Sequence, residues 1–307
     1  MDQTQPRRTR ILAIVYPSLA ALLWGVAFVF QRRSAGSIGA FAFNGCRALV
    51  AFVSLGVYLA LRRKALPIPK DKNARKHLLK GGIVCGVALY AAANAQQLGM
   101  VGTEAGKAAF ITASYTVLVP VFGFFLGKRF TGSLWVSVGL ACVGLWLLCM
   151  KGSFVLNRYD LLEIICAVIY AWYILAVDYY AVGTNAVALS CVQFLVFAVL
   201  SWGTAFFVET VRWSDIAGCT VSILYLGIFS SAVAYTLQMK AQQIANPVTT
   251  TMSLSQESTI SVIAGAIALG EWLSGRELFG CLLMLTAVIL AQFPDAFRAR
   301  RKRMEEE

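Results

Sequence analysis

The sequence predicts an all-α integral membrane protein in which ten transmembrane helices form two inverted five-helix repeats around a central cavity. Three observations lead to this fold class: an apolar composition, ten long apolar blocks and an internal repeat. Of the 307 residues, 59% are hydrophobic and only 14% are charged, and the mean hydropathy is +0.70. Soluble chains of this length are about half apolar and about a quarter charged. The excess therefore indicates a polytopic protein that lies in the lipid bilayer.

The apolar residues gather in ten blocks, each close to the length that a helix needs to cross the bilayer. About 20 residues at a rise of about 1.5 Å each span roughly 30 Å of hydrocarbon. The first block follows three arginines and is too long for a signal peptide, so we expect a retained helix. The predicted helices are 11–30, 38–61, 81–98, 108–126, 133–150, 161–178, 186–208, 216–238, 248–269 and 278–293.

Basic residues predict which side of the membrane each connection faces. With a cytoplasmic N-terminus, 19 Lys and Arg residues fall in cytoplasmic segments and seven in outer loops. Cytoplasmic loops of membrane proteins carry such an excess, so both tails, 1–10 and 294–307, are predicted to be cytoplasmic in a prokaryotic cell membrane. The Arg32–Arg33 pair in an outer loop runs against the rule. Because the net charge of +12 has this topological explanation, no nucleic-acid partner is expected.

A weak internal repeat divides the ten predicted helices into two sets of five. The tripeptide AQQ occurs at 95–97 and again at 241–243, and "FFLGKRF" resembles "IALGEWL" at a similar offset. Five is an odd number, so the second set must enter the membrane from the opposite side. Many secondary transporters have such inverted repeats, with the substrate site near the midplane between the halves.

The chain lacks the patterns that would indicate a metal site, a cofactor or an enzyme. The eight cysteines are scattered singly and none has CxxC spacing, while the single histidine, His77, lies in a basic loop. Metal sites need clustered ligands. No nucleophile motif or phosphate-binding glycine loop is present. We therefore predict no metal, no cofactor and no enzymatic activity.

Three stretches resemble the EamA type of the drug/metabolite transporter superfamily. They are "ALLWGVAFVFQRR" in the first helix, "FNGCRALVAF" in the second and "LGEWL" after the ninth. The resemblance implies two EamA repeats, at 11–150 and 158–293, a central cavity and alternating access. Two departures stand out. Lys128 replaces the glutamate that the family usually has after the glycine of "LGKRF", and Ser258 replaces a proline that often follows the acid of the ninth helix.

The resemblance also implies a function. Members export amino acids and related metabolites, or carry sugars, nucleotide sugars, vitamins and drugs. A transporter of small molecules is expected, with export of amino acids or related compounds as the first hypothesis and another cargo as the alternative. An integral-membrane enzyme that uses Glu257 and Arg47 is a less favoured alternative, and a membrane assembly protein without cargo is another.

The ninth helix carries the sharpest polar pattern. Thr250, Ser253 and Glu257 share one helical face, and Gln256 lies beside it. Glu257 is nine residues into a helix expected to begin near Val248, which places it about 14 Å deep. A buried carboxylate is either neutral or held ionised by a cation. Glu257 is therefore expected to bind a substrate amine or to carry a coupling proton, with an inert helix contact as the alternative.

The fourth helix offers a matching polar side, and the aromatic residues offer further cavity candidates. Ser114 and Tyr115 are expected to lie near the polar face of the ninth helix across the pseudo-twofold axis. Several aromatic residues lie deep in predicted helices, and some are expected to line the cavity: Trp24, Tyr90, Tyr170, Trp172 and Tyr235.

Other polar residues have two interpretations each. Arg47, with Asn44 one turn before it, is either a structural anchor away from the cavity or a substrate or gating residue. The glutamines that end the third and eighth helices are either interfacial or gates at the two cavity mouths. They are Gln96 and Gln97 in the third helix and Gln242 and Gln243 in the eighth.

Overall fold

The computed structural model describes residues 7–68, 71–127, 132–149, 157–270 and 274–292, and the elements named in this part of the chain are all helices. In the first half these are α1 (Arg7–Ser34), α2 (Ala40–Leu61), α3 (Lys72–Gly99), α4 (Ala105–Ala113), α5 (Tyr115–Phe125) and α6 (Gly132–Cys149). In the second half they are α7 (Arg158–Ala181), α8 (Ala186–Val208), α9 (Trp213–Gly218), α10 (Thr220–Tyr225), the π-helix η1 (Leu226–Ala234), α11 (Tyr235–Gln242), α12 (Pro247–Leu254), α13 (Gln256–Leu269) and α14 (Gly275–Gln292).

Seven helical stretches in the described residues are long and apolar enough to cross a membrane. They are Arg8–Ser34, Ala40–Leu61, Lys72–Gly99, Ala105–Phe125, Arg158–Ala181, Ala186–Val208 and Thr220–Gln242. Two shorter apolar helices, Trp135–Gly144 and Leu278–Ala287, coincide with two further predicted blocks. The third helix begins at Lys72, earlier than the predicted 81, because Asp71 caps its start by accepting a hydrogen bond from the Ala74 amide at 2.8 Å.

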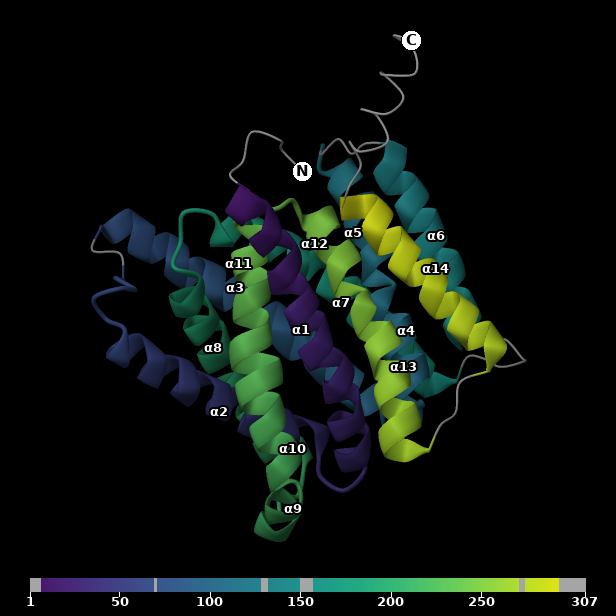
Figure 1. Cartoon of the computed structure of the whole chain (residues 1–307). Coiled ribbons are helices and arrows are strands. Elements are labelled where there is room, and N and C mark those ends of the chain that lie inside the picture. Colours follow the sequence, from purple (N-terminus) through teal and green to yellow (C-terminus); the bar gives the residue numbers. More distant parts are fainter. Residues whose placement is uncertain (1–6, 69–70, 128–131, 150–156, 271–273, 293–307) are drawn as a thin grey trace.

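The helices pack in pairs that join the two halves of the chain. α6 and α14 lie side by side at one edge of the bundle, while α2 packs against α8 and α3 packs against both α7 and α8 (Figure 1). α1 contacts α13, α11 and η1. The first turns of α1 and the last turns of α14 lie at the same side of the bundle (Figure 1).

The outer surface of the bundle is apolar, as expected where a protein faces lipid. Phe206, Phe207 and Ile267 are each more than 80% exposed, which is unusual for a surface in water. Trp172, which the sequence placed deep in its helix, is also on this surface. It is 49% exposed and stacks on Phe122 with ring centroids 4.9 Å apart. Trp172 lies well inside α7, as predicted, but its face of the helix points outward, so it is not one of the aromatic residues that line the central cavity.

Small residues allow α3 to approach α8 closely. A Cβ atom added at Gly82 would overlap the Val192 side chain, and one at Gly86 would overlap Val196. Close backbone approach at glycines spaced by four is typical of helix packing in membranes, where van der Waals contact replaces the hydrophobic effect.

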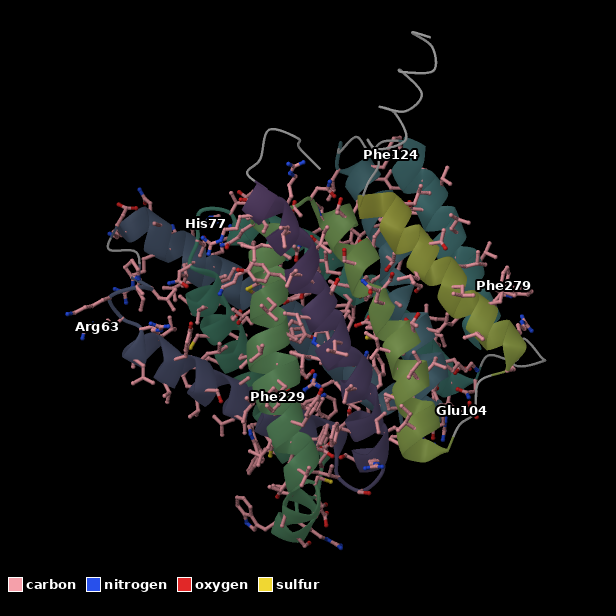
Figure 2. The ribbon with its side chains drawn as sticks, in the orientation of Figure 1. Arg63, His77, Glu104, Phe124, Phe229 and Phe279 are labelled. Carbon is pink, nitrogen blue, oxygen red and sulfur yellow. The ribbon has the colours of Figure 1, made fainter. Side chains whose placement is uncertain are left out.

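The fourth and ninth predicted helices are each broken by a serine, which the sequence analysis missed. α4 ends before Ser114 and α12 ends before Ser255, and the two serines have nearly the same backbone angles (φ −61° and −60°, ψ −13° and −14°). Each hydroxyl donates to the carbonyl three residues earlier, at 2.6 and 2.7 Å. Figure 2 places Glu104 and Phe124 at opposite ends of the α4–α5 pair, so this broken helix extends through the bundle.

An acidic side chain from the second half of the chain caps a helix of the first half. Glu209 follows α8, and its two carboxylate oxygens accept from the amides of Phe41 and Ala42 at 3.0 and 2.8 Å. These amides lie in the first turn of α2, where backbone donors lack helical partners. The cap fixes the start of the helix that carries Arg47.

Candidate functional site

A narrow cavity lies between the two halves of the chain. Its walls include residues that the sequence singled out: Trp24, Arg47, Gln96, Tyr115, Tyr235 and Glu257. Tyr170, another aromatic candidate from the sequence, lines it too, as do Gln31, Thr112 and Ser230. The space open to the centre of a water molecule is about 30 Å³. That is room for one or two waters. A metabolite can therefore enter only if the helices move apart.

Glu257 lies in the cavity wall, almost fully buried. It is in the first turn of α13, directly after the Ser255 break, and not in the middle of a continuous helix as the sequence predicted. The Tyr115 hydroxyl donates to Glu257 Oε1 at 2.9 Å. Tyr115 itself begins α5 after the Ser114 break. The two breaks thus bring the starts of α5 and α13 together at a carboxylate.

Arg47 also faces this cavity, so of its two interpretations the one that places it away from the cavity is wrong, and the substrate or gating role stays a prediction. Its side chain comes from α2, is 3% exposed and stands over the Phe197 ring at 5.7 Å. Within the described residues its Nε atom has no hydrogen-bond partner. Neither Arg47 nor Glu257 forms an ion pair with another described residue. The cavity therefore carries one buried positive group and one buried acid that do not neutralise each other.

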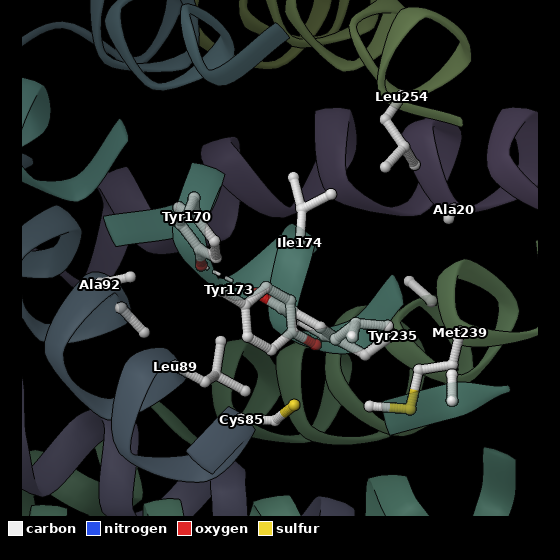
Figure 3. Packing of buried hydrophobic residues seen from close by; sticks show 14 of the residues in the cluster. Ala20, Cys85, Leu89, Ala92, Tyr170, Tyr173, Ile174, Tyr235, Met239 and Leu254 are labelled. Carbon is white, nitrogen blue, oxygen red and sulfur yellow. Dashed lines mark hydrogen bonds between the residues drawn. The ribbon is translucent and has the colours of Figure 1, made fainter. Parts of the chain in front are cut away.

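Aromatic side chains line the same cavity as Arg47 and Glu257. The hydroxyls of Tyr170 and Tyr235 share a hydrogen bond of 2.8 Å, and the Tyr173 ring packs edge-on against both (Figure 3). Trp24 packs against Tyr235 with ring centroids 4.7 Å apart, and its indole donates to the Ser230 carbonyl at 2.9 Å. Ser230 belongs to η1, and π-helical segments often occur at functional sites.

A chain of polar side chains leads from the cavity to a second buried acid, Glu163. Gln31 Nε2 donates to Gln96 Oε1 at 3.0 Å, and Gln96 Nε2 donates to Thr112 Oγ1 at 3.2 Å. Thr112 Oγ1 in turn donates to Glu163 Oε2 at 3.0 Å. Sequence reasoning missed Gln31, Thr112 and Glu163. The signal for Glu163 was an acid within an apolar block, but close enough to the block's end to suggest an interfacial position.

Five predicted site residues bond elsewhere and do not line this cavity. Thr250 and Ser253 donate to carbonyls one turn earlier in the same helix, and Ser114 does so at its break. Gln256 donates to the Ser253 carbonyl at 3.0 Å and to the Ser18 hydroxyl at 3.4 Å. The Tyr90 hydroxyl bonds to that of Thr204 on α8, at 2.6 Å. The polar groups of these five side chains therefore form hydrogen bonds within a helix or between helices.

The remaining predicted polar residues connect helices. Asn44 on α2 donates to a backbone carbonyl and a side chain of α3. Gln97 exchanges long hydrogen bonds with Gln31. Gln242 donates to a carbonyl of α7 at 2.8 Å, and Gln243 donates to two carbonyls near the α7–α8 turn. The side chains of Gln96, Gln97 and Gln242 are buried, so a water-exposed interfacial position does not describe them.

An ion pair joins α4 to the first turn of α7. Lys107 Nζ lies 2.6 Å from Asp160 Oδ2, and the Thr103 hydroxyl donates to the other oxygen at 3.0 Å. Asp160 also accepts from the Asn157 amide at 2.9 Å, which completes a capping box at the start of α7. The carboxylate is fully buried, while the Lys107 side chain is 30% exposed. This cluster connects the first turns of α4 and α7 at one end of the bundle.

The profile of the EamA-like transporter family matches residues 11–150 and 157–293. The chain belongs to the EamA-like transporter family. This transporter is 28% identical to an uncharacterised transporter of Archaeoglobus fulgidus over 282 residues, which cover 92% of this chain and 86% of the relative. A solved crystal structure superimposes on it with a TM-score of 0.73 at 19% identity, covering 94% of this chain and 98% of the other. That likeness shows the fold alone. The protein is thus a multi-pass membrane transporter.

One family departure has a visible consequence in this EamA-like chain. Ser258 donates through its hydroxyl to the Ala109 carbonyl at 3.2 Å, which ties α13 to α4 beside Glu257. A proline at this position would lack that donor. The other departure, Lys128, and the segments "GKRF" and "GEWL" beyond their glycines lie outside the described residues.

Proposed function

We propose that this transporter exports amino acids or related small compounds across the cytoplasmic membrane by alternating access. One observation carries the proposal: Arg47 and Glu257, of opposite charge, line the same cavity and are not paired with each other. A free amino acid carries both complementary charges. Its carboxylate would bind the Arg47 guanidinium, and its amine would bind Glu257.

The geometry of the two groups favours a cargo that bridges them. Arg47 is on α2, which packs on α8 and η1, whereas Glu257 is on α13, which packs on α1 and α4. The Tyr170–Tyr235 pair and Trp24 form an aromatic wall beside them. Aromatic faces also attract cations, so this wall suits an ammonium group as well as an apolar side chain.

Ten transmembrane helices in two inverted repeats are part of the proposal. In its support, the broken fourth and ninth helices have matching serine breaks, and the last helices of the two sets, α6 and α14, pair with each other. With the N-terminus in the cytoplasm, the starts of α4 and α7 face outward. Opening between these helices would expose the cavity to the outside, and opening at the other end would expose it to the cytoplasm.

The test is uptake of radiolabelled L-amino acids, compared with their methyl esters, into proteoliposomes. Glu257→Gln should abolish or strongly weaken transport of the amino acids, and Arg47→Gln should remove the preference for free carboxylates over esters. A hydrogen bond to a charged group contributes about 1.5–3 kcal/mol, which corresponds to roughly 10- to 150-fold in affinity. The matched controls are Glu104→Gln and Arg62→Gln, because both side chains are exposed and outside the cavity.

Wild-type rates and wild-type selectivity in both cavity variants would overturn the proposed recognition. If Glu257 carries the coupling proton instead, Glu257→Gln would flatten the pH dependence of transport. A melting-temperature screen with sugars, nucleotide sugars, vitamins and drugs covers the alternative cargoes, since a ligand that binds the folded state raises its stability.

A further inference from the structure

We propose that Glu163 is a second functional acid of this transporter: it binds the proton whose inward movement drives export. The inference rests on the proposed transport function. Its starting point is a carboxyl group of α7 that is fully buried, lies just outside the cavity and accepts a hydrogen bond from Thr112 in the cavity wall.

The surroundings of Glu163 favour the protonated carboxyl group in this closed arrangement. Oε2 accepts the hydrogen bond from Thr112, but Oε1 is buried and has no hydrogen-bond partner among the described residues. A Cβ atom added at Gly99 on α3 would lie 2.6 Å from Oε1, so this oxygen faces a position that has no side chain to bond with it. An unpaired charge in such a place costs several kcal/mol, and a bound proton removes that charge.

Among the residues that the structure describes, the charged and titratable groups near Glu163 do not supply a counter-ion. On its own helix, Asp160 and Cys166 lie within about one turn on either side. On α4, the nearest cation is Lys107, which already pairs with Asp160 at 2.6 Å. From α3 the contacts are the neutral Gln96, through Thr112, and Gly99. Deprotonation therefore requires a rearrangement that brings in water or frees Lys107.

The polar chain gives the cargo a route by which to influence this proton. Gln31, Gln96 and Thr112 all line the cavity, so a bound amino acid would contact them. Any rotation of Gln96 changes the hydrogen bond that it makes to Thr112, and hence the bond that Thr112 donates to Glu163. Cargo binding and proton binding are thereby coupled, and such coupling is reciprocal.

The position of Glu163 also suits exchange of the proton with the outer side. It lies one helical turn beyond Asp160, whose pair with Lys107 closes the α4–α7 end. When this end opens, water reaches the carboxylate and a proton binds. After closure and opening of the cytoplasmic end, the proton leaves as the next cargo molecule enters. One proton moves inward for each completed cycle, and no other reactant is consumed.

The first experiment does not depend on cargo. Infrared difference spectra of the purified full-length protein, recorded between acidic and alkaline pH, should contain the carbonyl band of a protonated buried carboxyl group. Glu163→Gln should remove one component of this carbonyl band. Glu257→Gln identifies the part of the band, if any, that comes from the Glu257 carboxyl group. Glu104→Gln, an exposed acid at the same end, is the matched control and should leave the band unchanged. A band that persists in full in Glu163→Gln overturns the proposal.

The second experiment separates this proposal from the transport function itself. Proteoliposomes with a pH dye inside are given a mixture of radiolabelled L-amino acids. Glu163→Gln should retain exchange of internal for external amino acids, because the cavity is intact, but lose accumulation driven by a pH gradient together with the dye signal. Thr112→Val keeps the acid but removes its hydrogen bond, so gradient-driven accumulation should fall by a larger factor than exchange does.

Absence of exchange in the wild-type protein would refute the proposed cargo. The infrared experiment would still test whether Glu163 binds a proton. Gradient-driven accumulation at the wild-type level in a folded Glu163→Gln protein would refute the proton role. The folded state of each variant is checked by its melting temperature and by size-exclusion chromatography before transport is measured.

Discussion

Breaking the Lys107–Asp160 ion pair should open the end of the bundle where α4 and α7 begin, which is the outer end in the proposed topology. Lys107→Met removes the cation but leaves Asp160 with its bonds from Thr103 and from the Asn157 amide. A hydrogen bond between charged groups contributes about 1.5–3 kcal/mol, and partial exposure of the lysine reduces this to about 1–2 kcal/mol. If the pair forms only in the closed state, the outward-open population should rise roughly 5- to 30-fold.

The assay is labelling of a cysteine in the cavity from the outer side. Ala27→Cys is suitable because Ala27 is small, lines the cavity and is 1% exposed. In a background without native cysteines, an impermeant maleimide should react faster when Lys107→Met is present. Lys107→Arg, which keeps the charge, and Glu104→Gln, an exposed neighbour, should both leave the rate unchanged. An unchanged labelling rate in a folded Lys107→Met protein would refute the role of the ion pair as a closing contact.

Two further predictions concern packing and topology. Gly82→Ala should lower the melting temperature because its Cβ would overlap the Val192 side chain, and such overpacking costs about 1–3 kcal/mol. Gly56→Ala, where the added Cβ meets open space, should be neutral or slightly stabilising. Equal melting temperatures of the two variants would contradict the close α3–α8 contact. Single cysteines placed in the 62–80 loop and at residue 155 should label from opposite sides of the membrane, and labelling of both from outside would contradict the cytoplasmic location of the termini.

Much of the fold followed from the sequence because transmembrane length and apolarity are local properties. Each predicted block overlaps a helix in the structure, and the family profile matches both halves. The breaks at Ser114 and Ser255 were not predictable in this way. Serine is common in apolar helices, and only the packed structure shows its hydroxyl bonded to the carbonyl three residues back. The break matters because it places Glu257 at a helix start.

Part of the candidate site followed from polarity alone. Glu257, Tyr115 and Trp24 were expected at the cavity and lie there, because polar groups in an apolar helix are directed toward the protein interior. Thr250 and Ser253 share the helical face of Glu257, yet their hydroxyls bond to their own backbone. Short hydroxyl side chains have this local option and a glutamate does not, so helical periodicity overestimates the number of residues available to a ligand.

The burial of Glu163 could not be predicted without knowing where its helix begins, because Glu163 lies near the end of an apolar block. The predicted block, 161–178, left Glu163 near its boundary, and the sequence analysis did not single it out. The helix in fact starts earlier, because Asn157 and Asp160 form a capping box before the apolar residues begin. Asp160 in this cap also forms the ion pair with Lys107 at the end of the bundle, so Lys107 already has an acidic partner. Glu163, one turn further in, lies between α3 and α4, and no cation among the described residues pairs with it. In the proposed mechanism, a single bound proton therefore determines the charge of this group.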